Sequence, residues 1–358
     1  MILFRYLAKE VGTTLIALTS ILVLIFMSNQ VVIYLNRAAN GHIPGMLVFQ
    51  LLMLELPNLL SLLLPLGFYF AILVAYGRLY ADSEIVVLQA CGYSPGKLLL
   101  HTFGLAAVVA LVVTIMMSLN PSIAHQRSKL LKSTGVQTII QTIIPRRFRA
   151  VMSDQYVFYV DTMNAKHTKA QGVFVAKQVQ HGDNYGWDIL TAQSATARKD
   201  PQTGEEYLLL MEGDNYQGQP GAADYKIASF RQYEARLPHQ TMLASTDIRT
   251  LPFQQLLPWS NPDLQKVAEL QWRISIPLMV FTLTMLGVPL SRVNPRSGKY
   301  AKILPGVVLA FVYANFMFIA RNWIVAGKIP SWLGMWWLHG IVILVGLTLL
   351  WRQRGSGS

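Results

Sequence analysis

The hydrophobic positions of the chain gather in six long runs, separated by short polar segments and one long polar region. A helix needs about 20 mostly apolar residues to cross the hydrocarbon core of a bilayer. Three runs precede the long polar region and three follow it: Thr13 to Leu35, Leu56 to Tyr76, Leu98 to Leu119, Trp272 to Leu290, Ile303 to Trp323 and Leu333 to Trp351. The pattern therefore predicts six transmembrane helices. The first run is longer than the apolar part of a signal peptide, so we expect it to remain as the first span.

The polar region from Asn120 to Gln271 has a different pattern. Short segments rich in aromatic and aliphatic residues, such as Tyr156 to Val160 and Tyr207 to Leu210, alternate with turn-forming clusters such as Pro201 to Gly204. Strands separated by turns at this spacing are typical of all-β domains, either sandwiches, jelly rolls or barrels. The region therefore predicts an all-β insertion between two membrane halves.

Composition and charge agree with a membrane location. The chain is 53% hydrophobic and 13% charged, whereas a soluble protein has about 25% charged residues. Its net charge of +12 comes largely from basic residues beside the spans. The short loops on one side of the predicted membrane carry Arg5, Lys9, Arg78, Lys97, Arg292, Arg296, Lys299, Lys302, Arg352 and Arg354, and those on the other side carry Arg37 and Lys328. The positive-inside rule then places both termini in the cytoplasm and the insertion in the periplasm. No nucleic-acid-binding signature accompanies the charge, so a nucleic-acid partner is not expected.

These observations together predict an α-helical membrane protein with six transmembrane helices plus an inserted periplasmic all-β, jelly-roll-like domain. Residues 1–119 form the first membrane half, with an N-terminal interfacial helix, three spans and a short helix at about 82–91. Residues 120–271 form the β domain, and residues 272–354 form the second membrane half. Residues 355–358 read Gly-Ser-Gly-Ser and resemble an artificial linker.

The chain lacks the patterns of an enzyme. Gly92-Tyr93-Ser94-Pro95-Gly96 matches the nucleophile elbow, but that motif needs a strand before the serine, and here two helices flank it. Gly92 fits the end of the first helix and Pro95 the start of the second. The chain has no phosphate-binding loop, and its seven histidines lack metal-site spacing. We therefore expect no catalytic residue, metal or cofactor, and we interpret the single cysteine, Cys91, as a small core residue.

The segment from Asp82 to Gly92 predicts a short helix in a cytoplasmic loop. Asp82 or Ser83 can cap its start, and Ile85, Leu88 and Cys91 fall on one face. One interpretation is an interfacial helix lying on lipid. The other is a docking helix that inserts into a groove of a cytoplasmic partner, with Glu84 reaching a basic residue. We favour docking, because the cytoplasmic leaflet is itself negative and repels an acidic tip.

Charged residues at or inside span ends are costly in lipid and therefore mark candidate functional positions. The chain has four of them, all in the outer half or at the outer edge of the bilayer: Arg37, Glu55, Arg273 and Arg321. Arg37 and Arg273 fit either interfacial anchors or head-group contacts. Arg321 could bind an anionic lipid head group in a cavity or pair with Glu55.

Five segments resemble one family of membrane proteins. They are Arg5-Tyr6-Leu7, Gly41 to Pro44, Leu79 to Ile85 with Ala90-Cys91-Gly92, Glu269 to Ile274, and Val288 to Gly298. In this order, and over essentially the whole chain, they resemble the F-type subunits of the LptF/LptG family of lipopolysaccharide-export permeases.

The resemblance implies a heterodimer with a G-like permease subunit, on a homodimeric cytoplasmic ABC ATPase, with a single-span periplasmic bridge protein. Such an assembly extracts lipopolysaccharide from the inner membrane. The resemblance makes Asp82 to Cys91 the coupling helix, puts Glu84 at the acidic position that faces the ATPase, and puts Arg321 at a basic position near a lateral gate in contact with membrane lipids. The family's basic residues in the first span are replaced here by Gln30 and Ile33, with Arg37 about one turn further on. Two rival readings are an ABC-type lipoprotein or peptide exporter, and a structural or sensory membrane protein without transport.

Overall fold

A computed structural model describes most of the chain. The described residues are 2–39, 43, 45–132, 145–151, 156–164, 169–181, 184–199, 206–218, 225–236, 248–257, 263–293 and 303–355. They divide into two compact units. The helical unit contains Met1–Val31, Leu51–Gln126 and Thr246–Ser358, and the second unit contains Val32–Gln50 and Arg127–Ser245. Most of the Gly41 to Pro44 segment and residues 294–298 of the last family-like segment lie outside the described residues.

The apolar runs form the long helices that the sequence predicts. These are α1 (Ile2–Ala39), α2 (Leu47–Ala81), α4 (Pro95–Lys132), α7 (Leu264–Leu290), α8 (Ile303–Val325) and α9 (Trp336–Gly355), with short helices α3 (Glu84–Ala90), η1 (Ile248–Thr250) and α6 (Phe253–Leu256). Because α1 runs unbroken from Ile2, the expected N-terminal interfacial helix and the first span are one helix.

Five of these helices (α1, α2, α4, α7 and α8) are long and apolar enough to cross a membrane. The helix expected as the sixth span, α9, forms but does not belong to this group. Its apolar stretch is shortened by His339 near the start and by Arg352 and Gln353 near the end. Transmembrane helices around an inserted β region are therefore confirmed, and a sixth crossing by α9 stays a prediction.

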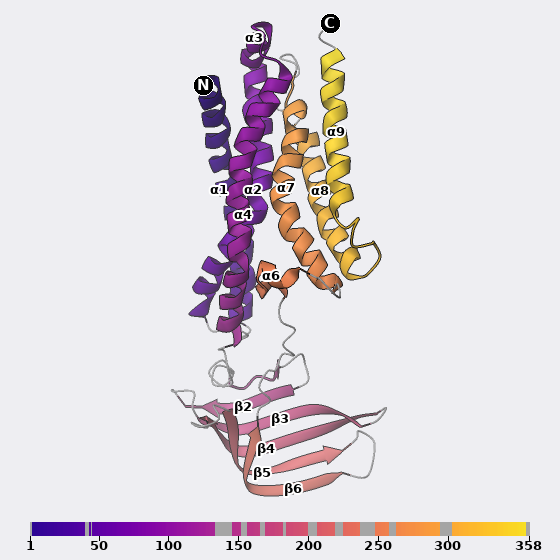
Figure 1. Ribbon diagram of the computed structural model, residues 1–358. Helices are drawn as coiled ribbons and strands as arrows, with labels where there is room; N and C mark the ends of the chain where they lie inside the picture. The colour runs from indigo at the N-terminus through magenta and orange to yellow at the C-terminus, as the bar shows by residue number, and fades with distance from the viewer. Residues whose placement is uncertain are drawn as a thin grey trace. The chain divides into compact units, whose positions relative to one another are not determined.

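Two helices form the centre of the helical unit. Most of the apolar stretch of α2 and of α7 is buried, whereas that of α1 is mostly exposed. One hydrophobic cluster joins α2 and α7 to α1, α3 and α4, and a second joins them to α8 and α9. Figure 1 shows the same order, with α7 between the α1, α2 and α4 group and the α8 and α9 pair. Gly306 allows the close contact of α8 with α2, since a Cβ there would lie 2.5 Å from Leu73 Cδ1.

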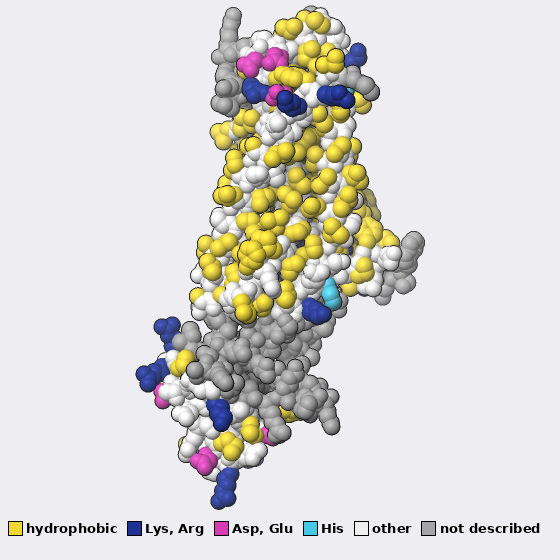
Figure 2. Space-filling model, turned by 90° about the vertical axis from the view of Figure 1, so that its left-hand side faces the viewer, with side chains coloured by type: hydrophobic (Ala, Val, Ile, Leu, Met, Phe, Trp, Pro, Cys, Tyr) yellow, Lys and Arg dark blue, Asp and Glu magenta, His cyan; other side chains and the backbone are white. Residues whose placement is uncertain are grey.

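The surface of the helical unit is apolar over a broad band. Figure 2 shows hydrophobic side chains covering this band, and Lys, Arg, Asp and Glu gathering at the end where α3 lies. Large apolar side chains such as Leu24 of α1 and Phe311 of α8 are exposed. A soluble protein would not leave so many large apolar side chains in water. Lipid or partner helices are the environment that suits this surface.

The second unit contains an antiparallel sheet built from β1 (Arg149–Val151), β2 (Tyr156–Met163), β3 (Lys169–His181), β4 (Asn184–Lys199), β5 (Glu206–Gly218) and β6 (Lys226–Arg236). Each strand pairs with the next in sequence, in the order β1-β2-β3-β4-β5-β6. The all-β insertion is confirmed. The described strands form a meander, and none of their pairings joins strands distant in sequence, as the crossing connections of a jelly roll would.

One row of residues interrupts the ladder in every strand from β2 to β6. The Cα pairing passes from Val160↔Val173 to Thr162↔Gln171 and skips one position, and it does the same between all later strands. We call this the crease row: Asp161, Gly172, Gln193, Glu212 and Arg231. All five residues are exposed. Gly172 and Glu212 have left-handed backbone, with φ of 64° and 51°.

The crease row turns the sheet onto itself. Inward-facing positions are two residues apart elsewhere in a strand, but three apart across the row, as in Ala170 to Val173 and Ala192 to Ala195. Residues from both sides therefore share one hydrophobic cluster, including Val160, Val175 and Leu210. Figure 1 shows the strands turning a sharp corner at one side of the sheet. The result is a folded sheet with an apolar inner face, which we call the trough.

Candidate functional site

The short helix α3 has one fully buried side chain, Ile85, and this residue anchors the helix on the helical unit. Ile85 is 1% exposed and packs in the cluster that contains Leu7, Leu79 and Leu98. Val86 and Val87, the next two residues, are 45% and 60% exposed. A short helix has little intrinsic stability, so this contact holds α3 in place. The helix thus presents an apolar outer face while its inner face is fixed to α1, α2 and α4.

The predicted helix lies where the sequence placed it, but its phase differs in part. Ile85 is buried and Leu88 is half-buried, as expected for one face, whereas Cys91 is exposed. The interpretation of Cys91 as a core residue is therefore wrong, because α3 ends at Ala90 and Cys91 begins the turn. Asp82 is exposed in the preceding turn. Ser83 occupies the N-cap position with φ 63° and makes no side-chain capping bond.

Polar contacts connect α3 and α2 to the start of α1. The Tyr6 hydroxyl donates a hydrogen bond to Glu84 Oε2 at 2.6 Å. Arg78 Nη2 donates to Glu10 Oε2 and forms an ion pair with it. Glu84 itself is exposed. Its carboxylate therefore lies at the surface, where a change of hydrogen-bond partner has little desolvation cost.

The turn after α3 has the geometry of a helix end. Gly92 has φ 88°, its N–H donates to Gln89 O at 3.0 Å, and the N–H of Tyr93 donates to Leu88 O at 3.0 Å. The next helix begins at Pro95. Ser94 thus lies between two helices, as the sequence indicates, and not on the strand-to-helix turn of a nucleophile elbow. Burial raises the pKa of the Tyr93 phenol.

Arg37 lies in the last turn of α1 and is exposed. Its guanidinium carbon is 5.8 Å from the ring centroid of Tyr34, which is 1% exposed. Arg127 of α4 lies at the same distance from this ring. Two cations at one aromatic ring form a basic patch. A contact of Arg37 with a lipid head group stays a prediction.

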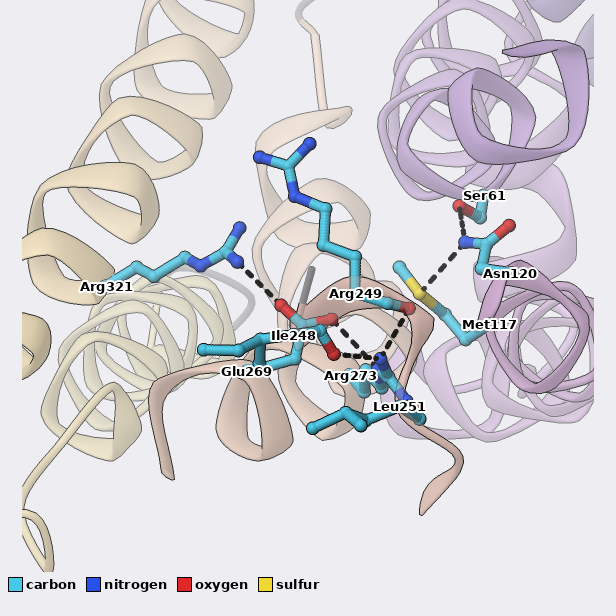
Figure 3. Close-up of polar contacts among 9 residues, drawn as sticks. All are labelled: Ser61, Met117, Asn120, Ile248, Arg249, Leu251, Glu269, Arg273 and Arg321. Atoms are coloured by element: carbon cyan, nitrogen blue, oxygen red, sulfur yellow. Dashed lines mark hydrogen bonds and ion pairs between the residues drawn. The ribbon is translucent and has the colours of Figure 1, made fainter. Parts of the chain in front are cut away.

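Glu55 is 7% exposed in α2 and heads a line of polar side chains. Asn58 Nδ2 donates to Glu55 Oε1 at 3.1 Å, and Ser61 Oγ donates to Asn58 O at 2.8 Å. Asn120 Nδ2 of α4 donates to Ser61 Oγ at 3.4 Å (Figure 3). These bonds satisfy polar groups that would otherwise be costly in an apolar surrounding. The line joins α2 to α4.

Arg273 and Arg321 meet at one buried carboxylate that was not among the candidates from the sequence. Arg273 Nε donates to Glu269 Oε1 at 2.9 Å, and Arg321 Nη2 donates to Glu269 Oε2 at 2.6 Å. Figure 3 shows Arg321 reaching Glu269 from α8, with Arg273 beside Glu269 on α7. We call these three residues the arginine–glutamate cluster. For Arg321 the sequence left open a lipid head group or Glu55, and the structure shows an ion pair with Glu269.

Arg273 is 6% exposed, so its interpretation as an interfacial anchor is wrong. Its guanidinium donates to Leu251 O at 2.8 Å and Arg249 O at 3.1 Å as well as to Glu269. Arg321 is the more accessible cation of the cluster, with 23% of its side chain exposed, and it lies 5.2 Å from the ring centroid of Trp272. No group of three metal-binding side chains converges among the described residues.

The combination of apolar helices, a β insertion and the short helix α3 can now be compared with known proteins. Residues 5–352 match the family described as "Lipopolysaccharide export system permease LptF/LptG". This chain belongs to the LptF/LptG family. It is 29% identical over 369 residues to the lipopolysaccharide export system permease protein LptF of Escherichia coli K12, covering 100% of this chain and 99% of the relative. The LptF protein of Shigella flexneri is similar to the same extent.

Membership of the LptF/LptG family and the apolar helices make the chain a multi-pass inner-membrane permease subunit of the LptF type. One residue of its site was missed from the sequence, although a signal for it exists. Glu269 and Arg273 are four residues apart, the spacing at which a carboxylate and a guanidinium meet on a helix. The partner across the helices, Arg321, is 52 positions away and depends on the packing of α7 against α8.

Proposed function

We propose that this chain is the F-type permease subunit of an ABC transporter that extracts lipopolysaccharide from the inner membrane. It pairs with a G-like subunit, and a homodimeric cytoplasmic ATPase powers it. A single-span bridge protein receives the lipid on the periplasmic side. The family match, the names of the relatives and the absence of a phosphate-binding loop from the sequence support this proposal.

The observation that carries the proposal is the seating of α3. Its outward residues Val86 and Val87 and its acidic Glu84 offer an apolar and charged docking surface, while Ile85 joins this surface to the core of α1, α2 and α4. A push on the outer face therefore reaches three long helices through one buried side chain. The chain has no ATP site of its own in sequence, and α3 is the element suited to receive motion from an ATPase.

The orientation proposed from the loop charges puts α3 and both termini in the cytoplasm and the β unit in the periplasm. Cations that are at least partly accessible then lie at the outer side of the bilayer. Arg321 and Arg37 bind anionic head groups, and the trough carries acyl chains against Val160, Val175 and Leu210. Each acyl CH₂ that leaves the bilayer costs about 0.8 kcal/mol, so a multi-chain lipid needs both an energy source and an apolar receiver.

A cross-linking experiment tests this function in the reconstituted complex. Phe230 is partly buried and packs against the trough cluster, so a photoreactive phenylalanine analogue fits at this position. The neighbouring Arg231 is exposed in the crease row and is the matched outward control. We expect ATP-dependent lipopolysaccharide adducts at position 230 and few at 231.

The outcome separates the rival functions. Adducts with lipoprotein in place of lipopolysaccharide would make the chain a different exporter. Equal labelling with and without ATP, or at both positions, would leave the trough without a transport role. Glu84→Lys reverses the charge of the docking surface, and we expect it to abolish association with the ATPase. Unchanged association would favour a membrane-anchored protein without transport.

A further inference from the structure

Two arginines share one buried carboxylate, Glu269, near the N-terminal end of α7. The Glu269 side chain is 7% exposed, and each of its oxygens accepts from a different guanidinium, at 2.9 Å from Arg273 and 2.6 Å from Arg321. A buried ion is stable only when its hydrogen bonds and its charge are both compensated. Within these three residues one negative charge pairs with two positive charges, so the two arginines compete for Glu269.

The two arginines differ in their contacts with residues other than Glu269. Arg273 reaches into η1 and the residue after it, with Nη1 at 2.8 Å from Leu251 O and Nη2 at 3.1 Å from Arg249 O. Carbonyl groups at the end of a short helix lack partners within it, and the planar guanidinium supplies several donors at once. η1 is the first described element after β6 along the chain. Arg273 therefore fixes the segment through which the chain returns to α7.

Arg321 is the member that an anion can reach first. Its side chain is 23% exposed, against 5% for Arg273. It lies over the Trp272 ring, which is itself only partly buried. A phosphate group offers a larger charge than a carboxylate and two oxygens for a bidentate contact. Such a group can compete with Glu269 for Arg321.

We propose that Glu269 works as an exchange element, releasing Arg321 to the phosphate of a bound lipid head group and tightening on Arg273. The proposal rests on the function proposed above and adds a positioning role for Glu269. While Arg321 is bound, one carboxylate serves two cations. Once Arg321 turns to the phosphate, Glu269 and Arg273 form a neutral pair, and their mutual attraction in a poorly solvated site increases. Binding of a lipid phosphate to Arg321 of α8 thereby strengthens the hold of Arg273 on η1.

Hydrogen exchange of residues 248–257, measured in the full complex in nanodiscs, reports how firmly Arg273 binds η1. The probe is lipid A with both phosphates. The comparison arms are enzymatically dephosphorylated lipid A, phosphatidylglycerol and inorganic phosphate. In the wild type we expect phosphorylated lipid A to slow exchange of this segment several-fold and the dephosphorylated form to have no effect. Equal slowing by phosphatidylglycerol or inorganic phosphate would overturn the assignment to lipid A.

Three variants distinguish the exchange from a merely structural role. Arg321→Gln leaves Glu269 paired with Arg273 alone, as lipid binding does in this proposal, so exchange without lipid should already be slow and lipid should slow it no further. Glu269→Gln should raise basal exchange and also remove the response. Lys328→Gln removes an exposed cation that follows α8, and it should respond like the wild type.

A full lipid response in Glu269→Gln would overturn the exchange and leave the proposed export function intact. Failure of wild-type protein to bind lipid A at all would instead overturn the export function itself. Because Arg321 is partly exposed, we expect its variant to fold even if the buried Glu269 variant does not. Slow exchange without lipid in Arg321→Gln supports the exchange, and a wild-type rate without lipid there would overturn it.

Discussion

Replacing Ile85 by alanine tests whether α3 transmits force through its buried contact. The side chain is 1% exposed in a cluster with Leu7, Leu79 and Leu98. Truncating a buried isoleucine costs about 2–5 kcal/mol. Since α3 lies at the edge of the core, we use the lower value. About 2 kcal/mol shifts the equilibrium between seated and unseated α3 by about thirtyfold. The loss falls on the seating of α3, because the long helices keep their other contacts.

The control is Val87→Ala in the same helix. Val87 is 60% exposed, so its truncation alters the docking face and leaves the core unchanged. The assay follows ATP hydrolysis and lipopolysaccharide release in the same reconstituted sample and reports lipid released per ATP. We expect Ile85→Ala to retain hydrolysis but to release much less lipid per ATP. Val87→Ala should weaken association with the ATPase while the bound fraction keeps the wild-type ratio.

An unchanged ratio in Ile85→Ala would refute this mechanism of coupling. Identical behaviour of the two variants would refute it as well, because the buried and exposed faces of α3 would then have no separate roles.

Three further substitutions have defined outcomes. Gly213→Ala places a Cβ 1.9 Å from the Thr191 carbonyl oxygen. Overpacking of this kind costs about 1–3 kcal/mol, so hydrogen exchange of β4 and β5 in the full-length protein should accelerate. The control is Gly45→Ala, where a Cβ would have nothing within 4 Å; it should leave this exchange unchanged. In Gly306→Val the new side chain would contact Leu73 and Tyr69, so the variant should separate α8 from α2 and lower the melting temperature. Gly340→Ala is the control, because a Cβ there has nothing within 4 Å. An equal fall in melting temperature for both variants would contradict the close packing of Gly306 against α2. Tyr6→Phe frees Glu84 from its 2.6 Å hydrogen bond and should strengthen ATPase binding about twofold to tenfold, measured by titration; weaker binding would show that Tyr6 positions Glu84.

The sequence predicts the elements of the fold better than their contacts. Long apolar runs form helices because lipid leaves the backbone no other way to satisfy its hydrogen bonds. Alternating residues such as Tyr156 to Val160 form strands for a similarly local reason. The crease row has no comparable signal, since its left-handed residues are a glycine, Gly172, and a glutamate, Glu212. Only the pairing of neighbouring strands aligns them.

The same distinction applies to the site. The short helix α3 was predictable because the turn residues and Gly92 mark its ends. The exposure of Cys91 was not, since it follows from where a two-turn helix stops. The pairing of Arg321 with Glu269 depends on the packing of two helices and could not be read from either one alone.

The crease row constrains how this β unit can vary in length. Because successive side chains of a strand point to opposite faces, losing or gaining one residue beside the row would move a whole half-strand of apolar side chains to the outside. Changes in the turns between strands have no such effect. Insertions should therefore be tolerated at the turns. In any variant that keeps the apolar inner face, a residue an even number of positions from the row should remain at an even number, and one at an odd number should remain at an odd number.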